Sequence, residues 1–175
     1  MQLETERLIL RSFGEEDVDI MAQLFTNTDF MRFSLGVFTE RKQTVAFIEK
    51  VIGWDRVGIP SQFAVVPRGE KAVIGYCGFF ITLKCQMKSR SGTGWIPITG
   101  TAASSPKPCA QCAITAFADS KLPRVISLVH PENIPSRRVA EKNGMKMEKR
   151  ITFRGFPTLV YAMTREAWLA NRDAS

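Results

Sequence analysis

A short apolar run that leads directly into a capped helix constrains this fold more than any other feature of the sequence. Val125–Val129 reads V-I-S-L-V, which is typical of a strand buried on both faces. Asn133, a favoured N-cap residue, then begins a predicted helix that Gly144 ends. A strand followed so closely by a helix favours an architecture in which helices pack on a sheet.

The same alternation of patterns extends over most of the chain. Ser12 and Glu15 have the spacing of a capping box, so we expect Ser12 to cap the first helix and Thr39 to cap the second. The other predicted elements, in chain order, are a strand at Leu3–Arg11, a helix with Val18, Met21, Leu24 and Phe25 inward, a helix ending at Gly53, a hairpin of Gln62–Val66 with Ala72–Ile81, and a hairpin of Met147–Phe153 with Thr158–Met163 around the turn Arg154–Pro157.

This order of elements indicates an α+β fold with a mixed sheet and helices packed on it. The chain of 175 residues contains no internal repeat and no evident linker. A length of this size suits one domain, so we expect a single domain over residues 1–175.

The net charge of +7 is concentrated in one segment. Lys84, Lys88, Arg90 and Lys107 contribute +4 of it, and no Asp or Glu occurs between Lys71 and Ala118. The rest of the chain is only modestly basic, so a nucleic-acid-binding domain ranks last among the functions we consider.

The sequence also lacks the marks of a membrane or secreted protein. No stretch approaches about 18 consecutive apolar residues, the length that a membrane span needs. Met1–Arg7 has no apolar region of the kind found in secretory leaders. Four cysteines in such a chain favour a reducing compartment, and we expect a cytoplasmic protein with no membrane partner.

Two blocks resemble a known family. Leu3–Arg11, L-E-T-E-R-L-I-L-R, resembles the opening strand of the GNAT N-acetyltransferase superfamily, in its branch of ribosomal-protein N-terminal acetyltransferases. Asn133–Met145, N-I-P-S-R-R-V-A-E-K-N-G-M, resembles that branch's N-x-x-S…E-K-x-G-F block, with Met145 in place of the usual Phe. The resemblance covers about Leu3–Ile81 and Leu122–Trp168.

The resemblance implies a fold and a reaction. The fold is a mixed, mostly antiparallel central sheet flanked by helices. The reaction is transfer of an acetyl group from acetyl-CoA, the cosubstrate, to a primary amine by direct attack in a ternary complex. We expect the amine acceptor to be a small molecule or a protein N-terminus, and the protein to be a monomer or a homodimer.

The segment at about 83–116 departs from the family pattern. The fourth strand and glycine-rich loop of the family belong there, yet neither string is present, and Pro106 and Pro108 fall inside the helix that follows in the family. We hypothesise that this segment is read out of frame. In a frame shifted by one base, the Trp95/Ile96 junction must encode Asp, and allowed codons over residues 90–100 spell E-I-G-Y-R-L-D-P-D-Y-W.

The frame hypothesis predicts a strand near Arg90–Pro97 and a helix near Ala103–Phe117. The alternative is a truly divergent segment, which implies a catalytically impaired GNAT-like pseudoenzyme that acts as a binding module.

The resemblance also implies site residues. Ser136 would be catalytic, donating a proton to the departing thiolate, and Asn133 would hold the pantetheine arm or the strand end. The predicted cofactor-binding set is Trp95, Ile96 and Pro97 beside the arm, Thr101, Ala102, Ala103 and Ser105 at the pyrophosphate loop, and Asn133 with Ser136. The alternatives are an ordinary helix cap for Asn133 and a solvated first-turn serine for Ser136.

Several roles stay open. Arg90 stands where the family commonly has a carboxylate, so no general base is assigned. The acceptor pocket is expected near Phe30–Val37 and Thr152–Leu159, although their aromatic residues also suit an ordinary core. The Cys109-x-x-Cys112 spacing has no second ligand pair, so no metal site is expected. His130, the one histidine, is expected to be a strand-end residue with a local hydrogen bond.

Overall fold

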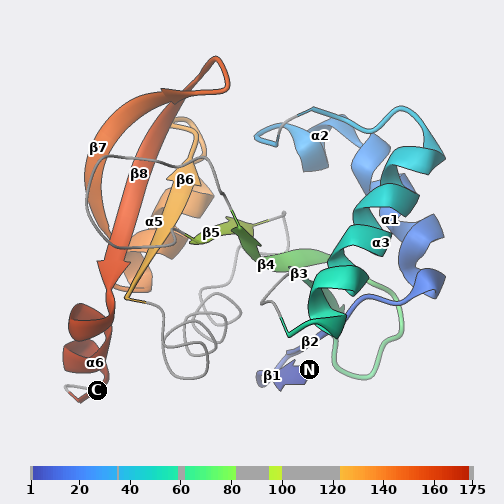
Figure 1. The fold of residues 1–175 in the computed structure, drawn as a ribbon, viewed down its shortest axis with the longest axis horizontal. Helices are drawn as coiled ribbons and strands as arrows, with labels where there is room; N and C mark the ends of the chain where they lie inside the picture. Colours follow the sequence, from blue (N-terminus) through green and yellow to red (C-terminus); the bar gives the residue numbers. More distant parts are fainter. Residues whose placement is uncertain (1, 35, 59–61, 82–94, 100–122, 174–175) are drawn as a thin grey trace.

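One sheet runs through the molecule, with helices on both of its faces (Figure 1). The computed structural model describes residues 2–34, 36–58, 62–81, 95–99 and 123–173. Neighbouring strands are antiparallel except β5 and β6, which are parallel. This confirms the mixed, mostly antiparallel sheet. In spatial order the strands are β1 (Gln2–Glu4), β2 (Leu8–Arg11), β3 (Gln62–Pro67), β4 (Gly75–Ile81), β5 (Trp95–Thr99), β6 (Arg124–Val129), β8 (Phe156–Thr164) and β7 (Lys146–Phe153).

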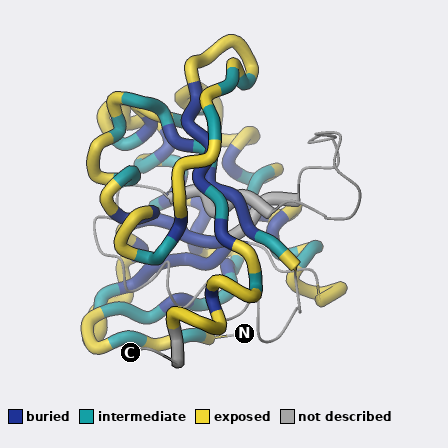
Figure 2. The backbone as a smooth tube through the Cα atoms, turned by 90° about the vertical axis from the view of Figure 1, so that its left-hand side faces the viewer, coloured by how far each residue is buried: buried dark blue, intermediate teal, exposed yellow. Residues whose placement is uncertain are grey.

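Strand β3 divides the hydrophobic core into two layers, because successive side chains of a strand point to opposite faces. Ala64 and Val66 pack with the first group of helices, and Phe63 and Val65 pack with the second. Figure 2 shows the resulting buried strands between exposed helix surfaces. The first group of helices is η1 (Glu15–Asp17), α1 (Val18–Thr26), α2 (Thr28–Met31) and α3 (Arg41–Arg56), and the second is α5 (Ile134–Lys142) and α6 (Arg165–Asp173).

The chain begins with two strands where the sequence predicted one. Strands β1 and β2 pair antiparallel, with Gln2 opposite Arg11, so the single strand predicted at Leu3–Arg11 is wrong. Thr5 causes the reversal, because its hydroxyl oxygen accepts a hydrogen bond of 3.0 Å from the Leu8 amide. Helix α6 was not predicted at all.

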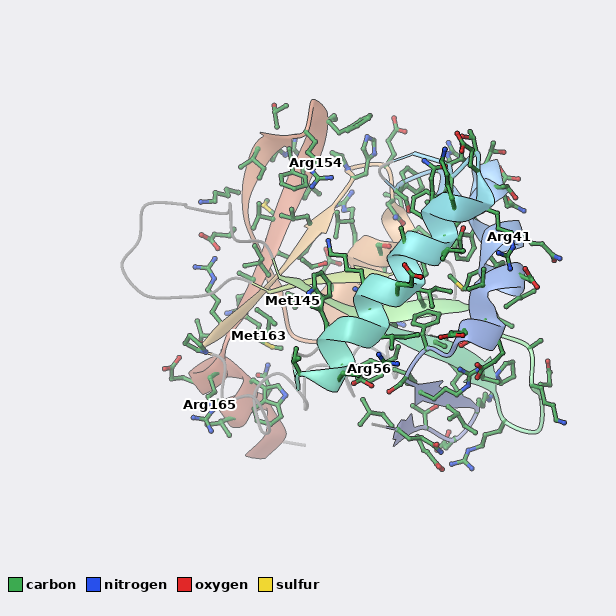
Figure 3. All side chains as sticks on the ribbon, turned by 45° about the vertical axis from the view of Figure 1, so that its right-hand side comes forward. Arg41, Arg56, Met145, Arg154, Met163 and Arg165 are labelled. Atoms are coloured by element: carbon green, nitrogen blue, oxygen red, sulfur yellow. The ribbon has the colours of Figure 1, made fainter. Side chains whose placement is uncertain are left out.

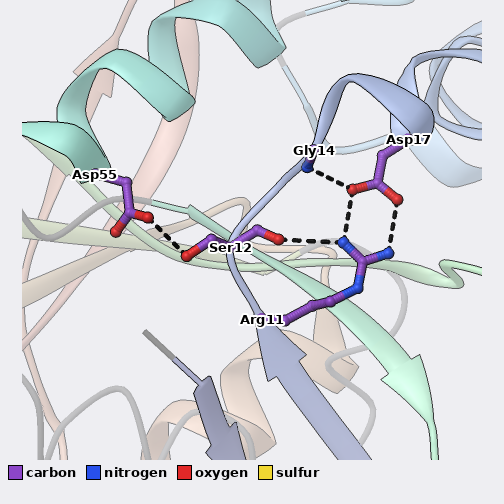
Figure 4. A network of polar contacts seen from close by, with 5 residues as sticks. All are labelled: Arg11, Ser12, Gly14, Asp17 and Asp55. Carbon is purple, nitrogen blue, oxygen red and sulfur yellow. Dashed lines mark hydrogen bonds and ion pairs between the residues drawn. The ribbon is translucent and has the colours of Figure 1, made fainter.

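The predicted caps of the first two helices are also wrong. The N-cap of η1 is Gly14 rather than Ser12, and Ser12 Oγ donates to Asp55 Oδ2 at 2.6 Å (Figure 4). A hydrogen bond to a carboxylate is stronger than one between neutral groups, which explains the difference. Before α3 the N-cap is Glu40 rather than Thr39. Helix α3 continues past Gly53, so this glycine does not end it.

The C-terminal hairpin has a tighter turn than predicted. Phe153 lies opposite Phe156, which leaves Arg154 and Gly155 as the two turn residues. Both have positive φ, 50° and 86°, as a two-residue type I′ turn requires. Figure 3 places Arg154 at the outer end of this hairpin, and the strands themselves confirm the prediction. Among the described helices, none is both long and apolar enough to span a membrane.

Candidate active site

The sheet opens between β5 and β6. These parallel strands share one partner pair, Trp95 with Val125, whereas the antiparallel ladders on either side of them run the length of β5 and of β6. Within the described part of the chain, β5 beyond Trp95 and β6 beyond Val125 therefore have a strand partner on one edge only. Figure 1 shows β6, β7 and β8 diverging from β2, β3 and β4 on the two sides of this opening. Two strand edges with backbone donors and acceptors thus face it.

Helix α5 begins just beyond the end of β6, at the same opening. Asn133 is its N-cap, and Asn133 Oδ1 accepts from the Ser136 amide at 3.2 Å, so the helix-cap alternative for Asn133 is confirmed. The Ile134 amide donates to the Glu132 carbonyl at 2.8 Å, and Pro135 has no N–H. The amides of this first turn are thus already engaged. A ligand at this end of α5 would meet the half-buried side chains of Asn133 and Ser136 rather than a nest of free amides.

A polar network fixes α5 and the loop before it against the sheet. The Tyr161 hydroxyl of β8 is buried and donates to Glu141 Oε1 at 2.9 Å. Arg137 Nε donates to the same hydroxyl at 3.4 Å, and its Nη1 donates to the Pro131 carbonyl at 3.3 Å. The hydrogen bond to Tyr161 raises the pKa of Arg137. Arg137 therefore helps hold the loop that carries His130 and Asn133.

The aromatic residues of the expected acceptor region divide between core and surface. Phe30 and Phe38 pack in the core layer that contains α1 and α3. The ring centroids of Phe30 and Phe25 are 6.5 Å apart, and those of Phe38 and Phe25 are 4.7 Å apart. Phe33 and Phe156 are instead exposed, at 37% and 54% of their surface. Phe33 and Phe156 are thus more exposed than Phe30, Phe38 and Phe153, which are half-buried.

One contact was not predicted from the sequence. Phe33 stacks on His130 with ring centroids 5.4 Å apart. The local hydrogen bond expected for His130 is present, because the Glu132 amide donates to His130 Nδ1 at 3.3 Å. No periodicity links residues so far apart in the chain. The available signal was a lone histidine at a strand end next to a proline.

The predicted cofactor-binding residues fall into three groups. Trp95, Ile96 and Pro97 lie on β5, beside the opening. Asn133 and Ser136 lie at the start of α5. The other four positions, predicted for the pyrophosphate, lie outside the described residues: Thr101, Ala102, Ala103 and Ser105. The helix expected near Ala103–Phe117 also lies outside them. The strand expected near Arg90–Pro97 is confirmed from Trp95 onward, where β5 begins.

Comparison with known proteins gives the family. Residues 7–146 match the family model described as the acetyltransferase (GNAT) domain. The chain belongs to the GNAT acetyltransferase family. An uncharacterized N-acetyltransferase of Bacillus subtilis, YnaD, is 28% identical to this acetyltransferase over 177 residues, covering 96% of this chain and 99% of that protein.

Two solved structures show the same fold. One is the ribosomal-protein-S5-alanine acetyltransferase from Vibrio fischeri, with a TM-score of 0.77 and 13% identity over 96% of this chain and 98% of that one. The other is the aminoglycoside acetyltransferase AAC(6')-Ib in complex with coenzyme A, with a TM-score of 0.76 and 16% identity over 94% of this chain and 99% of that one.

Proposed function

We propose that this protein transfers an acetyl group from acetyl-CoA to a primary amine by direct attack in a ternary complex. The observation that carries the proposal is the opening between β5 and β6, next to the start of α5. The family match and the coenzyme A complex of a protein with the same fold support this use of the opening. We further propose that residues 1–175 act as one domain in the cytoplasm, as a monomer or a homodimer.

The residues at the opening fit a pantetheine arm. The arm is extended and carries amides, so it can hydrogen-bond to the open edges of β5 and β6 as an added strand does. Asn133 and Ser136 supply polar side chains where the arm would pass the start of α5. We propose that residues 100–105, which match the pyrophosphate-binding positions of the family, hold the pyrophosphate; the first-turn amides of α5 are already bonded and so are not available for it. When bound, acetyl-CoA supplies a thioester as the activated acetyl group.

In this proposal Ser136 carries the proton that the leaving group needs. The amine nitrogen forms a bond to the thioester carbonyl carbon, the carbon–sulfur bond breaks, and the Ser136 hydroxyl gives a proton to the thiolate directly or through water. The proton that the amine nitrogen loses passes through water to the Ser136 oxygen and restores the hydroxyl. An α-amino group, with a pKa of about 7.7–8.0, needs less help from a base than a lysine at about 10.4. This favours a protein N-terminus as the acceptor, as in the ribosomal-protein branch, although a small amine also fits.

A second candidate is a catalytically impaired GNAT-like pseudoenzyme that cannot hold acetyl-CoA and acts as a binding module. The observation that favours it is the acid-free segment at about 83–116, with prolines where the family has a helix. Calorimetry with acetyl-CoA separates the two functions, because the binding module would give no heat of binding.

The transfer reaction has its own test in Ser136. Ser136→Ala should lower kcat roughly 100-fold, as loss of a general acid does, and should raise the Kd for acetyl-CoA by no more than about tenfold, the value of one hydrogen bond to the arm. Lys146→Ala, an exposed change on β7, is the matched control and should leave kcat unchanged. An unaltered kcat in Ser136→Ala would show that Ser136 does not donate the proton.

A further inference from the structure

A stacked ring pair joins the two sides of the opening. Phe33 follows α2, which packs with β3 and β4 on one side of the opening, and His130 directly follows β6 on the other side. Their ring planes are 29° apart, and the centroids are 5.4 Å apart. Phe33 keeps 37% of its surface exposed, so the pair is accessible from solvent rather than part of the core.

The hydrogen bond of His130 fixes which ring nitrogen can donate. Nδ1 accepts from the Glu132 amide at 3.3 Å, so in the neutral ring the proton is on Nε2. No hydrogen bond to Nε2 occurs among the described residues. Within the described part of the chain, the neutral His130 ring therefore has an unused Nε2–H donor, just beyond the end of β6.

A positive charge lies against the Phe33 ring of this pair. The Arg32 guanidinium lies 5.2 Å from the centre of the Phe33 ring. A positive group at the Phe33 ring disfavours a second ammonium group on the ligand, and the His130 N–H donor favours an oxygen that accepts a hydrogen bond. The flat face of the ring pair suits a planar group such as an amide.

We propose that His130, supported by Phe33, selects acceptors that carry a carbonyl oxygen next to the amine. His130 Nε2–H donates to that oxygen, and the Phe33 ring holds the imidazole in the required orientation. Alkylamines and polyamines lack this oxygen and bind more weakly. The inference rests on the proposed acetyl transfer and narrows the class of acceptor; His130 is a specificity-determining residue, and the transfer chemistry does not depend on it.

A matched pair of acceptors isolates the carbonyl oxygen. Isopropylamine has a methyl group where alaninamide has its carboxamide, and the two amines are otherwise the same. The measured quantity is the ratio of their kcat/KM values, compared between wild type and each variant. The difference in pKa between the two amines is the same in every variant and therefore cancels.

Three variants distinguish donation from packing. His130→Leu removes the donor and should lower the alaninamide preference about tenfold, the value of one hydrogen bond to a bound substrate. His130→Gln keeps a side-chain N–H and should retain most of the preference. Phe33→Leu leaves His130 in place without its stacking partner and should lose an intermediate share. The Kd for acetyl-CoA should be unchanged in all three.

A second measurement needs no turnover. The chain contains one histidine, so the imidazole signals in a nitrogen-15 NMR spectrum are assigned without ambiguity. In the wild-type protein saturated with coenzyme A, alaninamide should shift the Nε2 signal and isopropylamine should not. The inference is overturned if His130→Leu slows both amines equally, or if alaninamide leaves the imidazole signals unmoved. Failure of the proposed function gives a different result, namely no transfer to any amine by the wild-type protein.

Discussion

Arg11 and Asp17 form one ion pair, but loss of Arg11 and loss of Asp17 should lower the free energy of unfolding by different amounts. Arg11 Nη1 and Nη2 each lie 2.7 Å from a different oxygen of Asp17, and the Gly14 amide donates to the same carboxylate at 2.9 Å (Figure 4). The Asp17 side chain is 4% exposed and that of Arg11 is 29% exposed. The pair joins the end of β2 to η1, directly before α1.

Removal of either partner leaves a different charge behind. Arg11→Met strands a buried carboxylate with one amide donor and should cost about 3–5 kcal/mol of the free energy of unfolding. Asp17→Asn leaves a guanidinium that water can reach, so its cost should be nearer about 1.5–3 kcal/mol. For a chain of this length the first loss lowers Tm by roughly 6–15 °C. Arg41→Met, which breaks an exposed pair with Asp19, is the control and should cost less than about 1 kcal/mol.

The pH dependence tests the same reasoning. Burial raises the pKa of Asp17, but the hydrogen bonds from Arg11 and from the Gly14 amide and the charge of Arg11 outweigh it, so the pKa is lowered. A lowered carboxyl pKa gives stability that is present above the unfolded value of about 3.9 and lost as pH falls through the folded value. The advantage of wild type over Asp17→Asn should therefore shrink in that acid range.

Urea unfolding of the variants at several pH values gives these free energies directly. In Arg11→Met the unpaired carboxyl should have a raised pKa, because burial then acts without the opposing charge. The stability deficit of Arg11→Met should thus narrow as pH falls from 7 toward 4. The reasoning is refuted if Asp17→Asn costs as much as Arg11→Met, or if the deficit of Arg11→Met does not change with pH.

Three further outcomes are expected. Tyr161→Phe removes the hydroxyl that bridges Glu141 and Arg137, and thermal unfolding should show a loss of about 1 kcal/mol, since Glu141 is exposed and can bond to water. Gly155→Ala should cost about 1 kcal/mol in urea unfolding because φ is 86°, and no atom lies close to the added methyl group to change that cost. Gly53→Ala is the control: it lies inside α3, its methyl group is equally unobstructed, and it should stabilise the protein by about 0.5–1 kcal/mol. Peptide mass spectrometry of cell-derived protein over Gln86–Lys121 should give the shifted-frame sequence, and masses that match the printed sequence would end the frame hypothesis.

Elements set by local patterns could be predicted, and elements set by distant partners could not. The strand at Val125–Val129, the cap at Asn133 and the helix end near Gly144 depend on neighbouring residues, and the structure confirms them. Ser12 instead bonds to Asp55, 43 residues away, and no local pattern carries that information. The capping-box spacing indicates only that the hydroxyl can accept a hydrogen bond from a helix amide, not that it does so.

The residues of the candidate site also separate into those that a local motif predicts and those that depend on tertiary packing. Asn133 and Ser136 came from a motif whose spacing survives in one short block. The contact of Phe33 with His130 depends on how α2 meets the end of β6, which follows from tertiary packing. The sequence did not distinguish Phe33 from Phe30, because aromatic residues serve a pocket and a core equally well.

Pro97 connects the opening of the sheet to the question of the middle segment. A proline removes a backbone N–H, so strands accept it at edges rather than between two partners. Strand β5 nevertheless forms with Pro97 opposite Phe79, because beyond Trp95 its second edge has no strand partner within the described residues. Recognition of an amide-bearing arm by that edge uses the main chain and tolerates altered side chains, but it loses one donor if the Pro97 nitrogen is on the open side. With the Pro97 nitrogen on that side, the proposed cosubstrate site would be more sensitive to this one residue than to the other side chains of β5.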